Sequence, residues 1–180
     1  TGKEGLKPNK AVNRILDVLV NVMRSIPFLI LLILVIPLTR AIVGKSYGPS
    51  ATIVPLTLAA APFIARLVES SLLEVDKGVI EAAQSMGAGI PTIVMKVMLL
   101  EARSSLLSGL AIALGTILGY SAMAGAVGGG GLGDIAIRYG YNRYQLDIMI
   151  VTVILLVALV QIMQAICMRL SRKLDKRITG

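Results

Sequence analysis

The sequence contains no histidine and a single cysteine, Cys167. The absence of histidine excludes Ser–His nucleophile pairs, histidine general bases and histidine metal ligands. One cysteine cannot form an internal disulfide, and in an apolar run it is typically a small hydrophobic side chain. We therefore expect neither a catalytic residue nor a metal site on this chain.

Charge is also scarce. Only 16% of the 180 residues are charged and 56% are hydrophobic, whereas about a quarter of the residues in soluble domains are charged. The net charge of +8 could suggest nucleic-acid binding, but the basic residues fall outside the longest apolar runs. That pattern favours the flanks of membrane spans and contact with lipid, and it argues against nucleic acid as a partner.

The long apolar runs predict an all-α integral membrane protein with about four transmembrane helices. A helix needs about 20 apolar residues to cross the hydrocarbon layer. The predicted spans are residues 15–44, 50–69, 104–127 and 147–169. Within the first, the uncharged stretch Ser25–Thr39 is too short alone, so the helix must extend beyond it. Proline residues mark expected kinks in the first two spans: Pro27, Pro37, Pro55 and Pro62.

The orientation follows from the basic flanks of the spans. Residues 1–14 and the tail 170–180 are rich in Lys and Arg, and both are expected on the cytoplasmic side. Four spans return both ends to one side, which agrees with that assignment. The loop 72–103 then also faces the cytoplasm, while residues 44–50 and 128–144 face outward. We expect the glycine run 128–133 to be a flexible outward loop and not a nucleotide site, because no strand precedes it.

The third span is rich in small residues and contains a GxxxG pattern from Gly115 to Gly119. Small residues let helix backbones approach closely. Two interpretations stay open, namely ordinary packing within the chain and a helix beside a pore at the centre of an assembly. On the second interpretation, Tyr120, Ser121 and Met123 face a translocation path and its gate.

The loop 72–103 is amphipathic and broken by glycine. Apolar residues recur at helical spacing from Val79 to Ile90, Gly87 can end a first helix, and Pro91 suits the start of a second. The sequence therefore predicts two short helices with a tight corner. Their apolar surface is typical of docking into a groove on another protein; a helix lying on the bilayer surface is the alternative.

Here the chain resembles a family. Glu81-Ala82-Ala83, followed after three residues by Gly87, is similar to the EAA loop of ATP-binding-cassette importer permeases. Segments 24–28, 53–57, 61–66, 119–123 and 126–133 resemble the methionine-type permeases in particular. The sequence departs from the family pattern at Leu100, where the family has proline.

The resemblance implies a bacterial inner-membrane permease that forms a homodimer and catalyses nothing itself. Its implied partners are two ATPase subunits that use ATP and Mg, and a substrate-binding protein outside the cytoplasm. It also implies five spans, so the fifth should precede Thr1. The residues implied to couple transport to the ATPase are Glu81, Ala82, Ala83, Met86 and Gly87.

Two alternatives remain for the function. The permease could carry another amino acid or small solute, because importers of this layout take much of their specificity from the binding protein. The chain could instead be an ion-coupled secondary transporter or a channel. Ion-coupled carriers usually hold carboxylates within the membrane, and we expect no acidic residue at the middle of a span, which argues against this second class.

Overall fold

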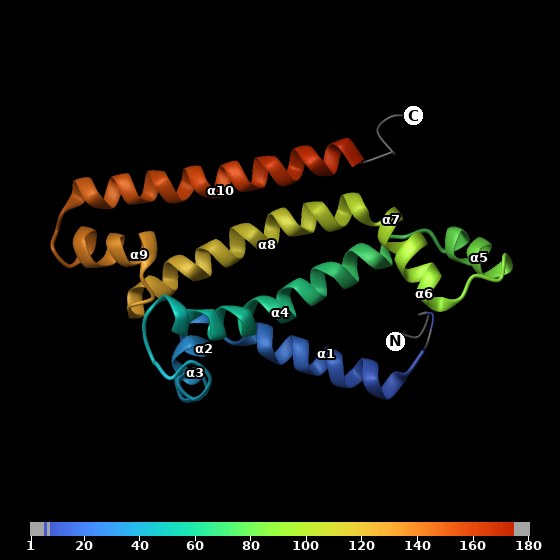
Figure 1. Ribbon diagram of the computed structural model, residues 1–180, viewed down its shortest axis with the longest axis horizontal. Helices are drawn as coiled ribbons and strands as arrows, with labels where there is room; N and C mark the ends of the chain where they lie inside the picture. The colour runs from blue at the N-terminus through green and yellow to red at the C-terminus, as the bar shows by residue number, and fades with distance from the viewer. Residues whose placement is uncertain (1–5, 7, 175–180) are drawn as a thin grey trace.

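The computed structural model describes residue 6 and residues 8–174 (Figure 1). In the described part of the chain every regular element is helical. The elements are α1 (Lys10–Ser25), α2 (Phe28–Leu34), α3 (Ile36–Val43), α4 (Pro49–Leu73), α5 (Lys77–Ser85), α6 (Ile90–Thr92), η1 (Ile93–Met98), α7 (Leu99–Glu101), α8 (Arg103–Ala124), η2 (Gly125–Val127), α9 (Gly131–Ile135), η3 (Ala136–Tyr141) and α10 (Leu146–Leu174).

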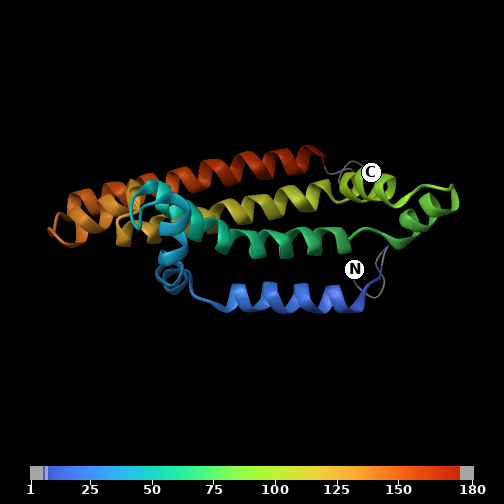
Figure 2. The ribbon, with the colours of Figure 1, turned by 60° about the horizontal axis from the view of Figure 1, so that its bottom comes forward.

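Three long helices, α4, α8 and α10, form the body of the molecule. α8 lies between the other two and packs against both, while α1 packs against the free side of α4 (Figures 1 and 2). Each of the three is long and apolar enough to cross a membrane. The segments predicted as the second and fourth spans lie within α4 and α10, and the third, residues 104–127, runs from α8 through the short helix η2. Pro55 and Pro62 lie inside α4 without dividing it.

The segment predicted as the first span, residues 15–44, is divided into three helices. α1 and α2 meet at 101°, and together they could make one bent span. The bend has a local cause: Ile26 has extended backbone angles, as expected of a residue that precedes proline, and Pro27 starts the next helix. Pro37 similarly occupies the first turn of α3.

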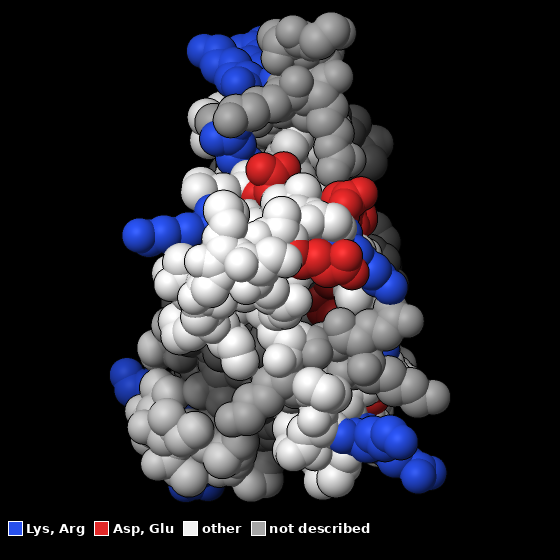
Figure 3. All heavy atoms as spheres, turned by 90° about the vertical axis from the view of Figure 1, so that its right-hand side faces the viewer, with Lys and Arg blue, Asp and Glu red and all other residues white. Residues whose placement is uncertain are grey.

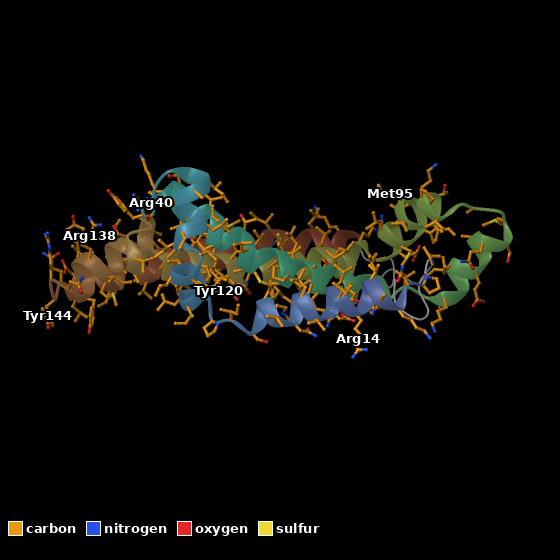
Figure 4. All side chains as sticks on the ribbon, turned by 90° about the horizontal axis from the view of Figure 1, so that it is seen from below. Arg14, Arg40, Met95, Tyr120, Arg138 and Tyr144 are labelled. Atoms are coloured by element: carbon orange, nitrogen blue, oxygen red, sulfur yellow. The ribbon has the colours of Figure 1, made fainter. Side chains whose placement is uncertain are left out.

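The two ends of the bundle differ. The start of α1, the end of α10 and the helices α5 to α7 all lie at one end, which we call the loop end (Figures 1 and 2). The short elements α2, α3, α9 and η3 lie toward the other, which we call the far end. A view with side chains agrees, because Met95 marks the loop end while Arg138 and Tyr144 mark the far end (Figure 4).

Most apolar side chains face outward, as they do in a protein surrounded by lipid. Only 6% of the most apolar window of α10 is buried within the chain. Apolar contact between helices is worth little in lipid, so small and polar residues decide where helices meet. Gly109 of α8 lies against Leu67 and Ser71 of α4, and Gly115 lies against Gln164 of α10.

A serine cluster joins the three long helices at the loop end. Its members are Ser71 of α4, Ser104, Ser105 and Ser108 of α8, and Ser171 of α10. The Ser105 hydroxyl donates to the Ser71 hydroxyl at 3.1 Å, and the Ser171 hydroxyl donates to the Ser104 carbonyl at 2.9 Å. Ser71 and Ser171 are buried. These bonds fix the register of α4 and α10 on α8.

Part of the glycine run at the far end is closely packed and helical, which the expectation of a flexible loop did not include. A Cβ added at Gly133 would collide with the carbonyl oxygen of Ala122, and one at Gly125 with the backbone of Asp134. A Cβ at Gly129 would lie 2.6 Å from the carbonyl oxygen of Ala124. The glycines therefore let α9 lie directly on the end of α8.

Candidate functional site: the loop end and the open face of α8

The first functional element is the corner between α5 and the helix that follows. The Asp76 carboxylate caps the start of α5 by accepting a hydrogen bond from the Gly78 N–H at 2.7 Å. At the other end, the Ala88 N–H donates to the Ala83 carbonyl at 3.1 Å and the Gly87 N–H donates to the Gln84 carbonyl at 2.9 Å. This pair of bonds is a Schellman motif, and Gly87 has the left-handed φ of +79° that it requires.

The second helix of the loop runs from Ile90 to Glu101, through α6, the π-helical turns of η1, and α7. Pro91 occupies its first turn. α5 packs against η1, and the buried residues of these two elements are Ala83 and Ile93. Two short helices with a glycine corner were predicted, and the structure confirms both the helices and the corner. Leu100 continues the second helix, and a bend at Ala102 separates it from α8.

The outer surface of the loop is open and mostly uncharged. Met86 is 81% exposed and Met95 is 64% exposed, while Glu81, Ala82 and Gly87 are exposed beside them. Seen from the loop end, uncharged side chains occupy the middle of the described surface, with acidic residues beside them and basic residues toward the edge (Figure 3). Ala83 differs from the other predicted coupling residues, because it is buried and holds the two helices together.

The predicted path residues on α8 divide into two sets. Tyr120 stacks on Phe28 of α2, with ring centroids 4.7 Å apart and an interplanar angle of 9° (Figure 4). Ser121 and Met123 are open, and Met123 is 52% exposed. Gly119 precedes Met123 by one helical turn, and a Cβ at Gly119 would meet no atom within 4 Å. Gly119 and Met123, one turn apart, therefore form an open strip on α8, with the Tyr120 ring beside it, while Ser121 is exposed on another face of the helix.

Packing within the chain, the first interpretation of the GxxxG pattern, holds for Gly115, while the pore interpretation stays a prediction for Gly119. A Cβ at Gly115 would lie 2.6 Å from the Gln164 amide nitrogen, so this glycine serves packing within the chain. Gly119 faces the space outside the described residues of this chain. The two glycines thus have different neighbours, although they lie close together on one helix.

Sequence reasoning missed a charged cluster between α1 and α4, centred on Arg66. One guanidinium nitrogen, Nη1, lies 3.1 Å from the Asp17 carboxylate and 2.5 Å from the Glu69 carboxylate. The other, Nη2, donates to the Asn21 side-chain carbonyl at 3.2 Å. A signal was present in the sequence, because Asn13, Asp17 and Asn21 recur every four residues among mostly apolar neighbours.

Apolar helices of spanning length, joined at one end by a two-helix loop with an exposed surface, define a multi-pass membrane protein. Residues 2–180 match the family described as the inner membrane component of binding-protein-dependent transport systems. The chain belongs to this family. The predicted family and the all-α membrane fold are both confirmed.

Individual relatives agree over nearly the whole chain. The probable D-methionine transport system permease protein MetI of Vibrio cholerae is 55% identical over 98% of this chain and 79% of its own length. The methionine import system permease protein MetP of Bacillus subtilis is 45% identical over 98% of this chain and 80% of its own. A solved structure described as an inward-facing conformation of the MetNI methionine ABC transporter is 48% identical, with a TM-score of 0.95 over 98% of this chain and 82% of that one.

Proposed function

We propose that this chain is the permease subunit of an ATP-driven importer whose substrate is methionine. The observation that carries the proposal is the likeness to the methionine transporter structure over almost the entire chain, together with relatives whose names specify methionine transport. On this proposal the chain forms the translocation path and a separate subunit hydrolyses ATP with Mg.

The partners proposed for the chain are a second copy of itself, a pair of ATPase subunits, an extracytoplasmic substrate-binding protein and the surrounding lipid. The family description supports a binding protein as partner. Extensive apolar exposure on α10 supports lipid contact, and the open strip on α8 supports an opposing surface from a second copy. A path between two copies needs small residues where backbones meet and a bulkier side chain where it closes, which fits Gly119, Ser121 and Met123.

The coupling role belongs to the loop 72–103, with Glu81, Ala82, Met86 and Gly87 at its surface and Ala83 inside it. Asp76 caps the start of α5, so the exposed Glu81 carboxylate is not needed as a cap. It can accept hydrogen bonds from a partner groove. Because Gly87 and Ala83 make the corner rigid, a displacement of the loop surface would move the ends of α4 and α8 with it.

We place the loop end, and both ends of the chain, on the cytoplasmic side of a bacterial inner membrane. Basic residues are more numerous at the loop end, which supports this orientation. Those of the loop end are Lys10, Arg14, Lys77, Lys96, Arg103, Arg169, Arg172 and Lys173, and those of the far end are Arg40, Lys45, Arg138 and Arg143.

The test is transport by the reconstituted complex. The permease is purified with its ATPase, placed in vesicles with the binding protein, and supplied with radiolabelled L-methionine and, separately, D-methionine. We expect ATP-dependent uptake of at least one of them. Another small solute is the competing substrate, so the ligand that copurifies with the binding protein is identified by mass spectrometry. A different ligand, with no methionine uptake, would remove methionine from the proposal while keeping the permease.

An ion-coupled carrier is not favoured by the structure. Asp17 and Glu69, the acidic residues within α1 and α4, both lie on the guanidinium of Arg66. A carboxylate that titrates during transport has to exchange its proton or ion with water, whereas these two are held by a permanent cation.

A further inference from the structure

The polar face of α1 is turned toward α4, with its side chains still partly exposed. Asn13, Asp17 and Asn21 lie along one side of the helix, and Asp17 and Asn21 contact α4 through Arg66. The opposite side carries exposed apolar residues such as Ile15, which is 67% exposed, and Val22. A surface helix in water shows the reverse arrangement. An inverted helix of this kind fits a position against lipid, with its polar groups directed at a specific partner.

The partner of this polar face is Arg66, a charged residue inside a membrane helix. Asp17 and Arg66 each lie about 10 Å along the axis from the loop end of their helices, at a rise of about 1.5 Å per residue. An ionisable group at such a depth is costly unless it is paired, and it is by default a candidate functional residue. Glu69 pairs with Arg66 within α4, so it neutralises the charge without joining helices. Asp17 and Asn21 reach Arg66 from α1 and therefore join the two helices.

Arg66 connects α4 to α1, and each of these two helices leads to a proposed functional element. Toward the loop end, α4 continues from Arg66 to Leu73 and then into the coupling loop. At the other end of α1, the chain turns through 101° and enters α2 at once. The first residue of α2, Phe28, is buried and stacks on Tyr120. Rigid helices therefore connect the coupling loop to the Tyr120 ring, with Arg66 at the crossing of α4 and α1.

The face of α4 that carries Arg66 is the face that approaches Tyr120. Ala59 of α4 packs against the cluster of Phe28, Leu32 and Ala124, to which Tyr120 also belongs. Arg66 follows Ala59 by about two helical turns and so lies on the same side of α4. The segment formed by α1 and α2 therefore contacts one face of the bundle at two places, the charged cluster and the Tyr120 cluster.

We propose that Arg66, Asp17 and Asn21 are positioning residues for the translocation path. They hold α1 to α4, so that movement of the coupling loop is passed to α2 and changes the contact of Phe28 with Tyr120. This inference rests on the proposed permease function. It assigns no substrate contact to the three residues.

The test compares two variants that each remove one carboxylate from Arg66. Asp17→Leu removes the ion pair between the helices and leaves Arg66 paired with Glu69 and hydrogen-bonded to Asn21. Glu69→Leu removes the contact within α4 and leaves Arg66 paired with Asp17. Asp17→Glu restores a carboxylate and serves as the rescue. Each is studied as the complete complex in vesicles, after subunit stoichiometry has been checked.

Three quantities are measured: methionine uptake, ATP hydrolysis, and labelling of a cysteine at position 123 by an impermeant thiol reagent, with Cys167 replaced by serine. For Asp17→Leu we expect about a fivefold rise in ATP hydrolysed per methionine imported, the effect of losing one partly exposed ion pair. ATP-dependent change in labelling should also be lost, while ATP hydrolysis continues. Glu69→Leu should stay within about twofold of the parent, and Asp17→Glu should recover at least half of the loss.

Equal defects in Asp17→Leu and Glu69→Leu would overturn the proposal, because the cluster would then serve stability alone. Parent-like coupling in Asp17→Leu would overturn it as well. If Asp17→Leu fails to assemble, Asp17→Asn keeps the shape and removes the charge, and the same comparison decides. The failure of the proposed function is distinct: it would appear in the parent complex, as an absence of uptake or of ATP-dependent labelling at position 123.

Discussion

The corner of the coupling loop allows a prediction with a worked magnitude. Gly87 has a φ of +79°, and a Cβ built on it would meet no atom within 4 Å. A substitution there is therefore strained by its backbone and not by a collision. The left-handed conformation costs an ordinary residue about 1 kcal/mol or more, with β-branched residues at the high end and asparagine at the low end. We expect Gly87→Asn, Gly87→Ala and Gly87→Val to destabilise the corner in that increasing order, with valine at about 2 kcal/mol.

The neighbouring glycine provides the matched control. Gly89 has a φ of −70°, and a Cβ there would lie 3.9 Å from Pro91 Cδ, an ordinary contact. Gly89→Ala should therefore behave as the parent. The loop lies outside the spans, so Gly87→Val should leave the permease inserted and the ligand affinity of the binding protein unchanged. Stimulation of the partner ATPase, or its association, should be lost.

The assay is ATP hydrolysis and methionine uptake in reconstituted vesicles, with subunit stoichiometry measured on the same sample. A loss of about 2 kcal/mol at the corner corresponds to a roughly thirtyfold smaller population of the docking-competent loop. Normal coupling in Gly87→Val, with the ATPase fully bound, would refute the claim that this corner is the coupling element. A loss of the same size in Gly89→Ala would refute the assignment of the strain to Gly87.

Three further results are expected. Gly115→Leu should prevent stable packing of α8 on α10, whereas Gly119→Leu should fold and block uptake; thermal stability and transport separate the two. Ser171→Ala should lower the stability of the complex by about 1 kcal/mol, because it removes the buried hydroxyl that bonds to Ser104 and Ser108, and a melting curve measures this against an exposed serine variant. In intact cells, an impermeant thiol reagent should modify a cysteine placed at Tyr47 and spare one placed at Lys173, and the reverse result would invert the orientation.

The parts of the fold that depend on local patterns were predictable from the sequence. Uninterrupted apolar runs identified α4, α8 and α10, because a spanning helix must satisfy its backbone hydrogen bonds internally whatever surrounds it. The coupling loop was predictable for a similar reason. Gly87 and Pro91 have conformational preferences that act within one helical turn, and the structure places each where its preference requires.

The sequence could not predict the contacts that form where segments distant in the chain approach closely. Proline at position 27 predicted a kink but not its 101° angle, which the packing of α2 on α4 and α8 determines. The glycine run looked flexible because glycine permits many conformations. Some of these glycines are needed because a larger residue would not fit. Nothing in the run itself indicates that the Ala122 backbone lies against Gly133. The Arg66 cluster was not predicted because its members come from two helices, and no local pattern indicates which helices pack together.

These contacts suggest why the bundle can transmit movement. At the loop end, α4, α8 and α10 are joined by serine hydroxyls, and α1 is joined to α4 by Arg66. Hydrogen bonds between membrane helices contribute only about 0.6 kcal/mol each on average, so each of these bonds is individually weak. At the far end, α8 and α9 meet through glycine backbone contacts that a methyl group would prevent. Close-packed backbone has one arrangement. On the proposed function, we therefore expect the loop end, which is joined by side chains, to yield to a docked partner more readily than the contact of α8 with α9, which is joined by close-packed backbone.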